Sequence, residues 1–86
     1  MTVHELKNEI NGLINKMPMW SNYYEAKCDA DYSFGYYFDE KSNKWITYVN
    51  SERGMKIQWD FEQEEDAVQK LYRKVRFQYR SDNKML

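Results

Sequence analysis

The chain has 86 residues, a formal net charge of -1 and 17% aromatic residues. A chain of this length is expected to form a single domain, residues 1–86, that buries only about 60–65% of its unfolded surface, so a few large side chains must build its core. The lone Cys28 cannot form an internal disulfide, which excludes a disulfide-stapled secreted scaffold. No signal region and no apolar run of about 18 residues occur, so neither export through a signal peptide nor a membrane-spanning helix is expected. A cytoplasmic protein is therefore favoured.

The charges are unevenly distributed along the chain. Residues 1–66 hold 13 acids and 7 bases, whereas residues 67–86 hold 1 acid and 6 bases. Acids near the start of a helix and bases near its end complement the helix dipole, which accounts for part of this asymmetry. The remainder leaves the body of the domain acidic.

The first predicted element is a helix. Thr2 followed by Glu5 forms a capping-box pattern, and Pro18 is expected to end the helix. Its apolar positions recur at a spacing of three and four residues: Val3, Leu6, Ile10, Leu13, Ile14 and Met17. Residues 18–31 fit an extended connection, a helical turn or a short edge strand equally well, and their structure stays open.

Three strands are predicted next. Residues 32–38 alternate between apolar and small or polar side chains, which is typical of a half-buried strand, and residues 39–44 are polar enough to form a hairpin loop. Residues 45–49 are β-branched and aromatic on both faces, so their inward face is not determined. After a turn at residues 50–54, an alternating strand follows whose apolar side is expected to cover the core: Met55, Ile57 and Trp59.

A closing helix begins near Glu62. Its apolar stripe consists of Ala67, Val68, Leu71, Tyr72, Val75 and Tyr79. Phe77 falls off this stripe and is either a partner contact or a single exposed aromatic residue. The predicted fold class is α+β: a helix, an antiparallel meander of three strands with room for a fourth, and a helix, with both helices packed on one sheet face.

The residue types offer little for catalysis or metal binding. His4 is the only histidine and has no Cys or second His at ligand spacing. Asp29 with Asp31, and Asp39 with Glu40, could be paired carboxylates, but neither pair has calcium-loop spacing, and solvated strand ends are the simpler interpretation. We therefore predict that the chain is not an enzyme and needs no cofactor or metal.

The distribution of charge also bears on whether the chain binds nucleic acid. Several bases lie along the last helix: Lys70, Arg73, Lys74, Arg76 and Arg80. The chain as a whole is acidic, and no aromatic residue on a strand has the basic flanks of a base-stacking motif. The sequence therefore predicts no nucleic-acid partner.

One group of motifs resembles a known family. The run Trp45-Ile46-Thr47-Tyr48, the turn Ser51-Glu52-Arg53-Gly54, a strand ending at Phe61, and Glu64-Glu65-Asp66-Ala67 with Leu71 are similar to the small immunity proteins of bacterial polymorphic toxin systems. The resemblance covers about residues 32–75. It implies a cytoplasmic protein that binds a cognate toxin C-terminal domain, often a nuclease, and blocks the toxin's active site without catalysis.

The expected partner contacts are acidic and aromatic residues. They are Asp29, Asp31, Asp39 and Glu40 around the sheet edge and first hairpin, with Tyr37 on the face opposite Phe34 and Phe38. Glu52 and Arg53 are either a charged recognition turn or residues that hold the turn in place. Two other classes stay open: a small regulatory or adaptor protein that forms a homodimer through a free strand edge and has no toxin partner, and an enzyme of unfamiliar type with a deep carboxylate pocket.

Overall fold

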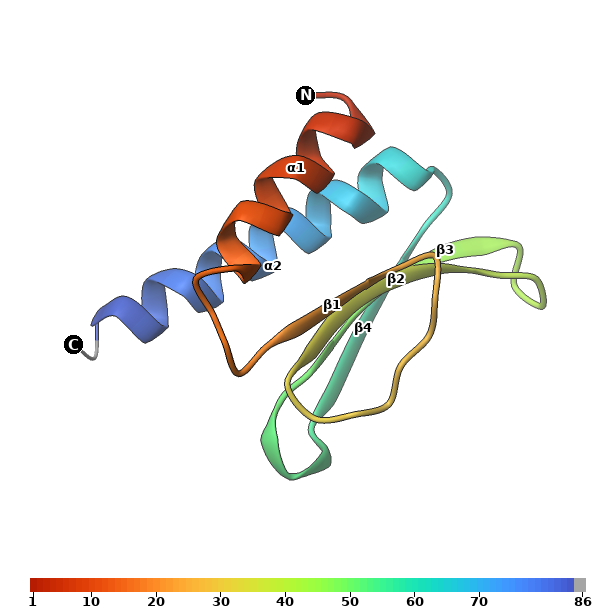
Figure 1. The fold of residues 1–86 in the computed structure, drawn as a ribbon. Coiled ribbons are helices and arrows are strands. Elements are labelled where there is room, and N and C mark those ends of the chain that lie inside the picture. The colour runs from red at the N-terminus through yellow and green to blue at the C-terminus, as the bar shows by residue number, and fades with distance from the viewer. Residues whose placement is uncertain (85–86) are drawn as a thin grey trace.

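The computed structural model describes the backbone of residues 1–84 and the side chains of residues 1–82. The elements in chain order are helix α1 (Val3–Ile14), strands β1 (Ser21–Tyr24), β2 (Ser33–Asp39) and β3 (Lys44–Asn50), the 3-10 turn η1 (Glu52–Gly54), strand β4 (Lys56–Phe61) and helix α2 (Glu64–Lys84). Both helices lie on one face of a four-stranded sheet (Figure 1), which confirms the predicted α+β fold. Neither of these helices is long and apolar enough to cross a membrane.

Helix α1 begins with the predicted capping box. The backbone N–H of Glu5 donates to the Thr2 hydroxyl at 3.2 Å, and the Thr2 N–H donates to the Glu5 carboxylate at 3.0 Å. The helix ends at Ile14, earlier than the expected stop at Pro18, and Asn15 is its C-cap. Met17 lies beyond the helix but is still buried in the core, because a turn returns the chain after Ile14.

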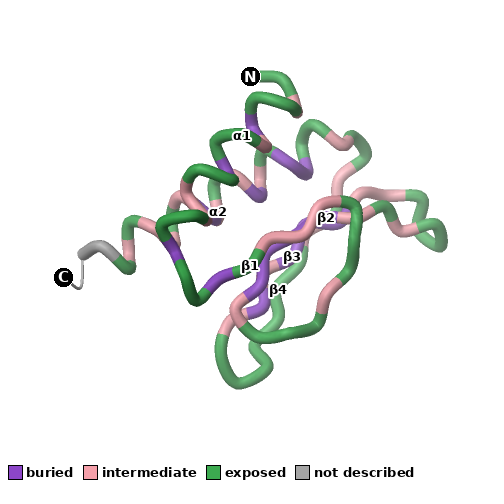
Figure 2. Tube along the Cα trace, viewed as in Figure 1, coloured by how far each residue is buried: buried purple, intermediate pink, exposed green. Residues whose placement is uncertain are grey.

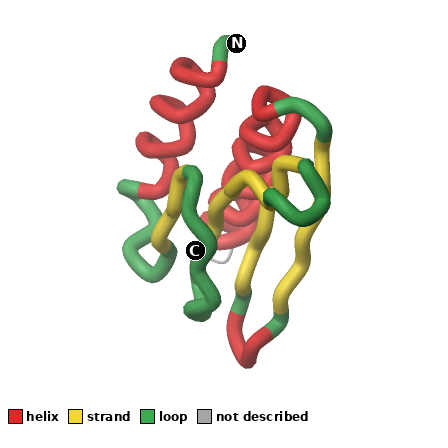
Figure 3. Tube along the Cα trace, turned by 90° about the vertical axis from the view of Figure 1, so that its right-hand side faces the viewer, coloured by secondary structure: helices red, strands yellow, loops and turns green. Residues whose placement is uncertain are grey.

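Strands β2, β3 and β4 form the predicted antiparallel meander. Phe34 lies opposite Val49, and Thr47 lies opposite Trp59, so these positions share the helix-facing side of the sheet. Strand β1 lies beside β2 at the outer edge of the sheet and runs parallel to it, with Ser21 opposite Ser33. The open segment at residues 18–31 thus contains a fourth strand that departs from the antiparallel pattern. Figure 3 shows the helices as one layer and the strands as the other.

The connection from β1 to β2, residues 25–32, crosses the sheet on the face away from the helices (Figure 1). The Tyr48 hydroxyl donates to the Ala26 carbonyl at 2.7 Å, and the Asn50 amide donates to the Cys28 carbonyl at 2.6 Å. Parallel strands usually need a crossover of about a dozen residues or more, so this short segment must be held by such contacts. The second face of the sheet is therefore partly covered by this segment.

The core lies between the helices and β2 and β3. Phe34 and Tyr36 on β2 are fully buried, and the Trp20 ring stacks on Phe34 with centroids 4.3 Å apart. On β3, the buried Thr47 hydroxyl donates to the Ala67 carbonyl of α2 at 2.7 Å. The register places Trp45, Thr47 and Val49 on the helix side and Ile46 and Tyr48 on the other, which settles the inward face of this strand.

The expectation that the apolar side of β4 covers the core is wrong for most of its length. Ile57 is 49% exposed and Met55, just before the strand, is 61% exposed, whereas Trp59 is half-buried. Figure 2 shows β4 largely exposed, whereas the first half of β2 and the middle of β3 are buried. The reason is that β4 is an edge strand, so only Phe61 and Trp59 come under the first turns of α2.

Candidate functional site

The predicted acidic contact residues do not form one cluster. Asp29 and Asp31 lie in the crossover segment, near the start of β2, whereas Asp39 ends that strand and Glu40 begins the following hairpin. Strand β2 has seven residues, and a rise of about 3.3 Å per residue separates its ends by about 20 Å. The two carboxylate pairs therefore occupy opposite ends of the sheet.

The first end contains Asp29, Asp31, Glu52 and Arg53. The Asp29 carboxylate lies 3.3 Å from the Lys56 ammonium group, and the Tyr32 hydroxyl donates to the Glu52 carboxylate at 3.2 Å. Burial and then this hydrogen bond raise the pKa of Tyr32. Arg53 is exposed and has a left-handed backbone with φ of 61°, which non-glycine residues seldom adopt. These contacts fix the β3–β4 turn against the crossover segment.

The second end is the β2–β3 hairpin. The Ser42 hydroxyl donates to the Asp39 carboxylate at 2.7 Å, and this hydrogen bond is the main reason that the pKa of Asp39 is lowered. Glu40 is exposed. Lys44, at the base of the hairpin, lies 3.7 Å from Asp60 of β4. The hairpin therefore presents Glu40 to solvent from a turn that its own side chains stabilise.

Tyr37 lies on the sheet face opposite Phe34, as its alternation with that residue predicts. Its ring centroid is 5.9 Å from that of Tyr48, and both rings border a cavity of about 120 Å³ that Cys28 also lines. A hydrogen bond with Cys28 raises the pKa of Tyr23 beside it. Tyr37 is half-buried against this face, so only part of its ring can meet a partner.

Titratable groups elsewhere make structural contacts. The Tyr36 hydroxyl donates to the Glu64 carboxylate at 3.0 Å, and burial together with this acid raises the pKa of Tyr36 well above its usual range. The exposed His4 ring shares a 3.3 Å hydrogen bond with Asn8 one turn along α1. In the part of the chain that the structure describes, no three His, Cys, Asp or Glu side chains come together as metal ligands would.

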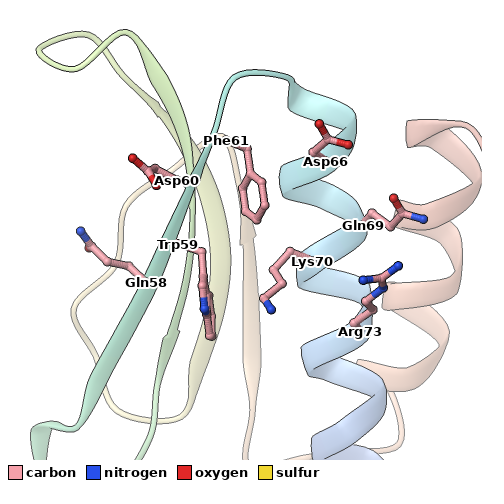
Figure 4. A pocket seen from close by; sticks show the side chains of 8 residues that line it. All are labelled: Gln58, Trp59, Asp60, Phe61, Asp66, Gln69, Lys70 and Arg73. Carbon is pink, nitrogen blue, oxygen red and sulfur yellow. The ribbon is translucent and has the colours of Figure 1, made fainter.

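A hollow in the surface lies between β4 and α2. A cavity of about 580 Å³ opens there, and Figure 4 shows Trp59 and Phe61 pointing from β4 toward α2, with Lys70 pointing back toward Trp59. A second cavity of about 180 Å³ continues from Trp59 past Ile57 to Phe77. We call this surface the β4–α2 groove and define it by Ile57, Trp59, Phe61, Lys70, Lys74 and Phe77.

Trp59 is the centre of the groove. The ammonium groups of Lys70 and Lys74 lie 4.7 Å and 4.8 Å from the centroid of its ring, one helical turn apart on α2. Each contact is a cation–π interaction, which the negative face of the indole favours. Two positive charges on one ring repel each other, so a negative group placed between them would be stabilised.

The sequence did not reveal this groove. The alternation of Ile57 and Trp59 was interpreted as a core-facing strand, and Lys70 and Lys74 were considered only as bases along the last helix that could bind nucleic acid. Phe77, which falls off the apolar stripe of α2, was the one signal of a second apolar surface on that helix, and it is 67% exposed. These residues can be assigned to one surface only when it is known that the strand lies at the edge of the sheet.

Comparisons of the chain with protein-family models, with curated proteins and with solved structures found no match.

Proposed function

We propose that this chain is a cytoplasmic immunity protein that binds a cognate bacterial toxin C-terminal domain, with a nuclease as the expected class, and blocks its active site without catalysis. The resemblance in residues 32–75 motivates the class of protein. The observation that carries the proposal is an excess of exposed carboxylates in residues 1–66, which extend to the first turn of α2.

Residues 1–66 contain six more acids than bases. Within the described residues, the ion pairs of this part of the chain are Lys44 with Asp60 and Lys56 with Asp29, so most of the remaining carboxylates have no basic side chain within 4.0 Å. A nuclease binds phosphates with a basic cleft, and an acidic surface of this kind complements that cleft and speeds encounter with it.

The carboxylates also stand on ordered backbone. Asp39 accepts its hydrogen bond from Ser42 within the hairpin, and Glu52 accepts one from Tyr32 across the sheet end. Groups that are already fixed lose little conformational entropy on binding, which favours tight association. Both ends of the sheet therefore offer charges that could enter a toxin cleft without rearrangement.

Co-expression with the toxin domain encoded beside this chain tests the proposal. We expect the chain to restore growth of cells that produce the active toxin domain and to co-purify with it as a complex. A toxin domain that stays lethal and does not bind the chain would overturn the proposal for that pair of proteins. A catalytically inactive toxin domain gives the same binding measurement without toxicity.

Charge reversal at each end identifies the contact surface. The pairs Asp39→Lys with Glu40→Lys, and Asp29→Lys with Asp31→Lys, test the hairpin and the crossover segment separately. We expect the pair at the toxin interface to weaken the complex at least about tenfold, because reversal adds repulsion to the lost attraction. The other pair is its matched control, and equal small effects from both pairs would contradict an acidic contact.

Arg53 can be tested without disturbing its turn. Its φ of 61° is a conformation that glycine adopts freely, so Arg53→Gly removes the side chain and keeps the backbone. A weaker complex at unchanged stability would indicate recognition by Arg53. Unchanged affinity would assign the residue to the turn alone.

A further inference from the structure

The β4–α2 groove lies along a free edge of the sheet. The strand order is β1-β2-β3-β4, and no strand within residues 1–84 pairs with the outer side of β4. The outer backbone N–H and C=O groups of an edge strand can hydrogen-bond to an added strand. A strand added beside β4 would extend the sheet below α2, and its alternate side chains would point toward the groove.

The groove contains a place for an apolar side chain. The cavity of about 180 Å³ has Phe34 and Val49 of the core among its lining residues, and Ile57 and Phe77 are exposed at its rim. Ile57 and Phe77 are 49% and 67% exposed, although each is a large apolar residue. Covering them with one further apolar side chain would remove both from water, a favourable change.

The groove is also positively charged. Five bases and two acids line its two cavities and an adjoining cavity of about 230 Å³ on α2: Lys70, Arg73, Lys74, Arg76, Arg80, Asp60 and Asp66. Asp60 already pairs with Lys44. The bases recur along α2 about once per turn, a spacing near 5–6 Å. Alternate side chains of a strand recur at about 7 Å, a similar spacing, so successive side chains on one face of an added strand would each lie near a base.

We propose that the β4–α2 groove binds an extended acidic peptide segment that adds to the β4 edge as a fifth strand. One apolar side chain of the segment enters the cavity between Ile57 and Phe77, and acidic side chains at the neighbouring helix-facing positions lie near Lys70 and Lys74. Its cavities are lined by none of the four carboxylates that the charge reversals above test, Asp29, Asp31, Asp39 and Glu40, and its occupation is measured without a toxin.

A second copy of the chain is a poorer occupant. Pairing of two β4 edges about a two-fold axis brings the same surface patch of each copy together. The bases of both α2 helices would then face one another across the axis, and like charges placed together oppose association. An acidic segment has the opposite sign and meets no such repulsion.

Single-stranded nucleic acid also carries negative charge, but it fits the groove less well. A phosphate backbone cannot continue the hydrogen-bond ladder that the β4 edge offers. Successive bases stack on several aromatic faces, whereas the Trp59 ring already contacts Lys70 and Lys74, which leaves Phe77 as the largely exposed ring of the groove. Both features favour a peptide.

The test is titration of the ¹⁵N-labelled chain with a synthetic peptide, followed by NMR of the backbone amides. The peptide has about eight residues, with leucine at one helix-facing position, glutamate at the next two such positions, and threonine between them. We expect amide shifts concentrated in β4 and α2. A copy of the peptide with N-methylated amides on its pairing edge should lose at least about tenfold in affinity, because it cannot form the ladder.

Variants of the chain test the charge. The double variant Lys70→Glu with Lys74→Glu should bind the peptide at least about tenfold more weakly. Lys27→Glu with Lys41→Glu is the matched control, since it makes the same charge change at two exposed lysines that line neither cavity of the groove. If the double variant fails to fold, replacement of the peptide's glutamates by lysines gives the same comparison with the unaltered chain.

Several results would overturn the proposal. Two concern the peptide: no amide shifts in β4 and α2 at about 1 mM peptide, or equal binding of the N-methylated peptide. Two concern other occupants: a homodimer whose interface is the β4 edge, or preferential binding of a thymidine oligonucleotide to the groove. Failure of the toxin rescue leaves this measurement unaffected, so the two proposals fail separately.

Discussion

The two edges of the sheet are protected to different degrees. Strand β1 has four residues, and its Tyr24 hydroxyl donates to the Lys7 carbonyl and the Asn11 side chain of α1, so helix and edge are joined. Strand β4 has six residues and exposes Ile57 beneath α2. Short or covered edges are the usual defence against unwanted pairing. The contrast assigns a structural role to the β1 edge and leaves β4 available for binding.

The largest expected effect is at Gly35 of β2, which packs against Tyr23 of β1 and Tyr48 of β3. A Cβ at this position would overlap the hydroxyl and ring of Tyr48 and lie 2.8 Å from the Tyr23 carbonyl oxygen. We expect Gly35→Ala to lower the free energy of unfolding by about 3 kcal/mol, as overpacking of a tight site does. Urea denaturation followed by circular dichroism measures the change.

Gly12→Ala is the matched control. A Cβ at Gly12 meets no atom within 4 Å, and the residue is exposed in the interior of α1. Alanine should therefore raise the free energy of unfolding by about 0.5–1 kcal/mol through helix propensity. A Gly35→Ala variant as stable as the unaltered chain would mean that the protected side is loosely packed, and the contrast between the edges would fail.

Tyr24→Phe probes the bond between the β1 edge and α1. The loss of the Tyr24 hydroxyl should lower the free energy of unfolding by about 1 kcal/mol, the usual net value of such a hydrogen bond. Hydrogen exchange should also accelerate at β1 amides and not at β4 amides. Acceleration at both edges would show that the two edges open together.

Alkaline pH should weaken the same contact. Burial raises the pKa of Tyr24 from 10.0 to about 12, so the folded state favours the protonated phenol. This contribution to stability is fully present below pH 10 and is lost as the pH rises toward about 12. The Tyr24→Phe variant should lose less stability over that range, and equal losses in both proteins would contradict the assignment.

The smallest effect on stability is expected at the open edge. Ile57→Thr should change the free energy of unfolding by less than about 0.5 kcal/mol, because the side chain is already half exposed and threonine suits a strand. The same variant should weaken binding of the probe peptide about fivefold through loss of apolar contact. A large loss of stability would show that Ile57 belongs to the core after all.

The spacing of apolar residues in the sequence predicted most helices and strands, because each of these elements is specified by residues close together in the chain. The Thr2–Glu5 capping box, the alternation along β2 and the apolar stripe of α2 were all visible in the sequence. The parallel strand β1 was not, since a connection as short as residues 25–32 normally joins antiparallel neighbours. The groove was missed because an alternating strand has the same pattern at the edge of a sheet as at its centre.

The sequence by itself determined the fold class, the meander and the uneven distribution of charge, all of which follow from local patterns and composition. Only the tertiary structure decided that Asp29 and Asp39 lie at opposite ends of the sheet, and that Trp59 meets Lys70 and Lys74. Such pairings depend on strand order and on the path of α2 across the sheet. Both are set by contacts between residues distant in the chain, which no local pattern encodes.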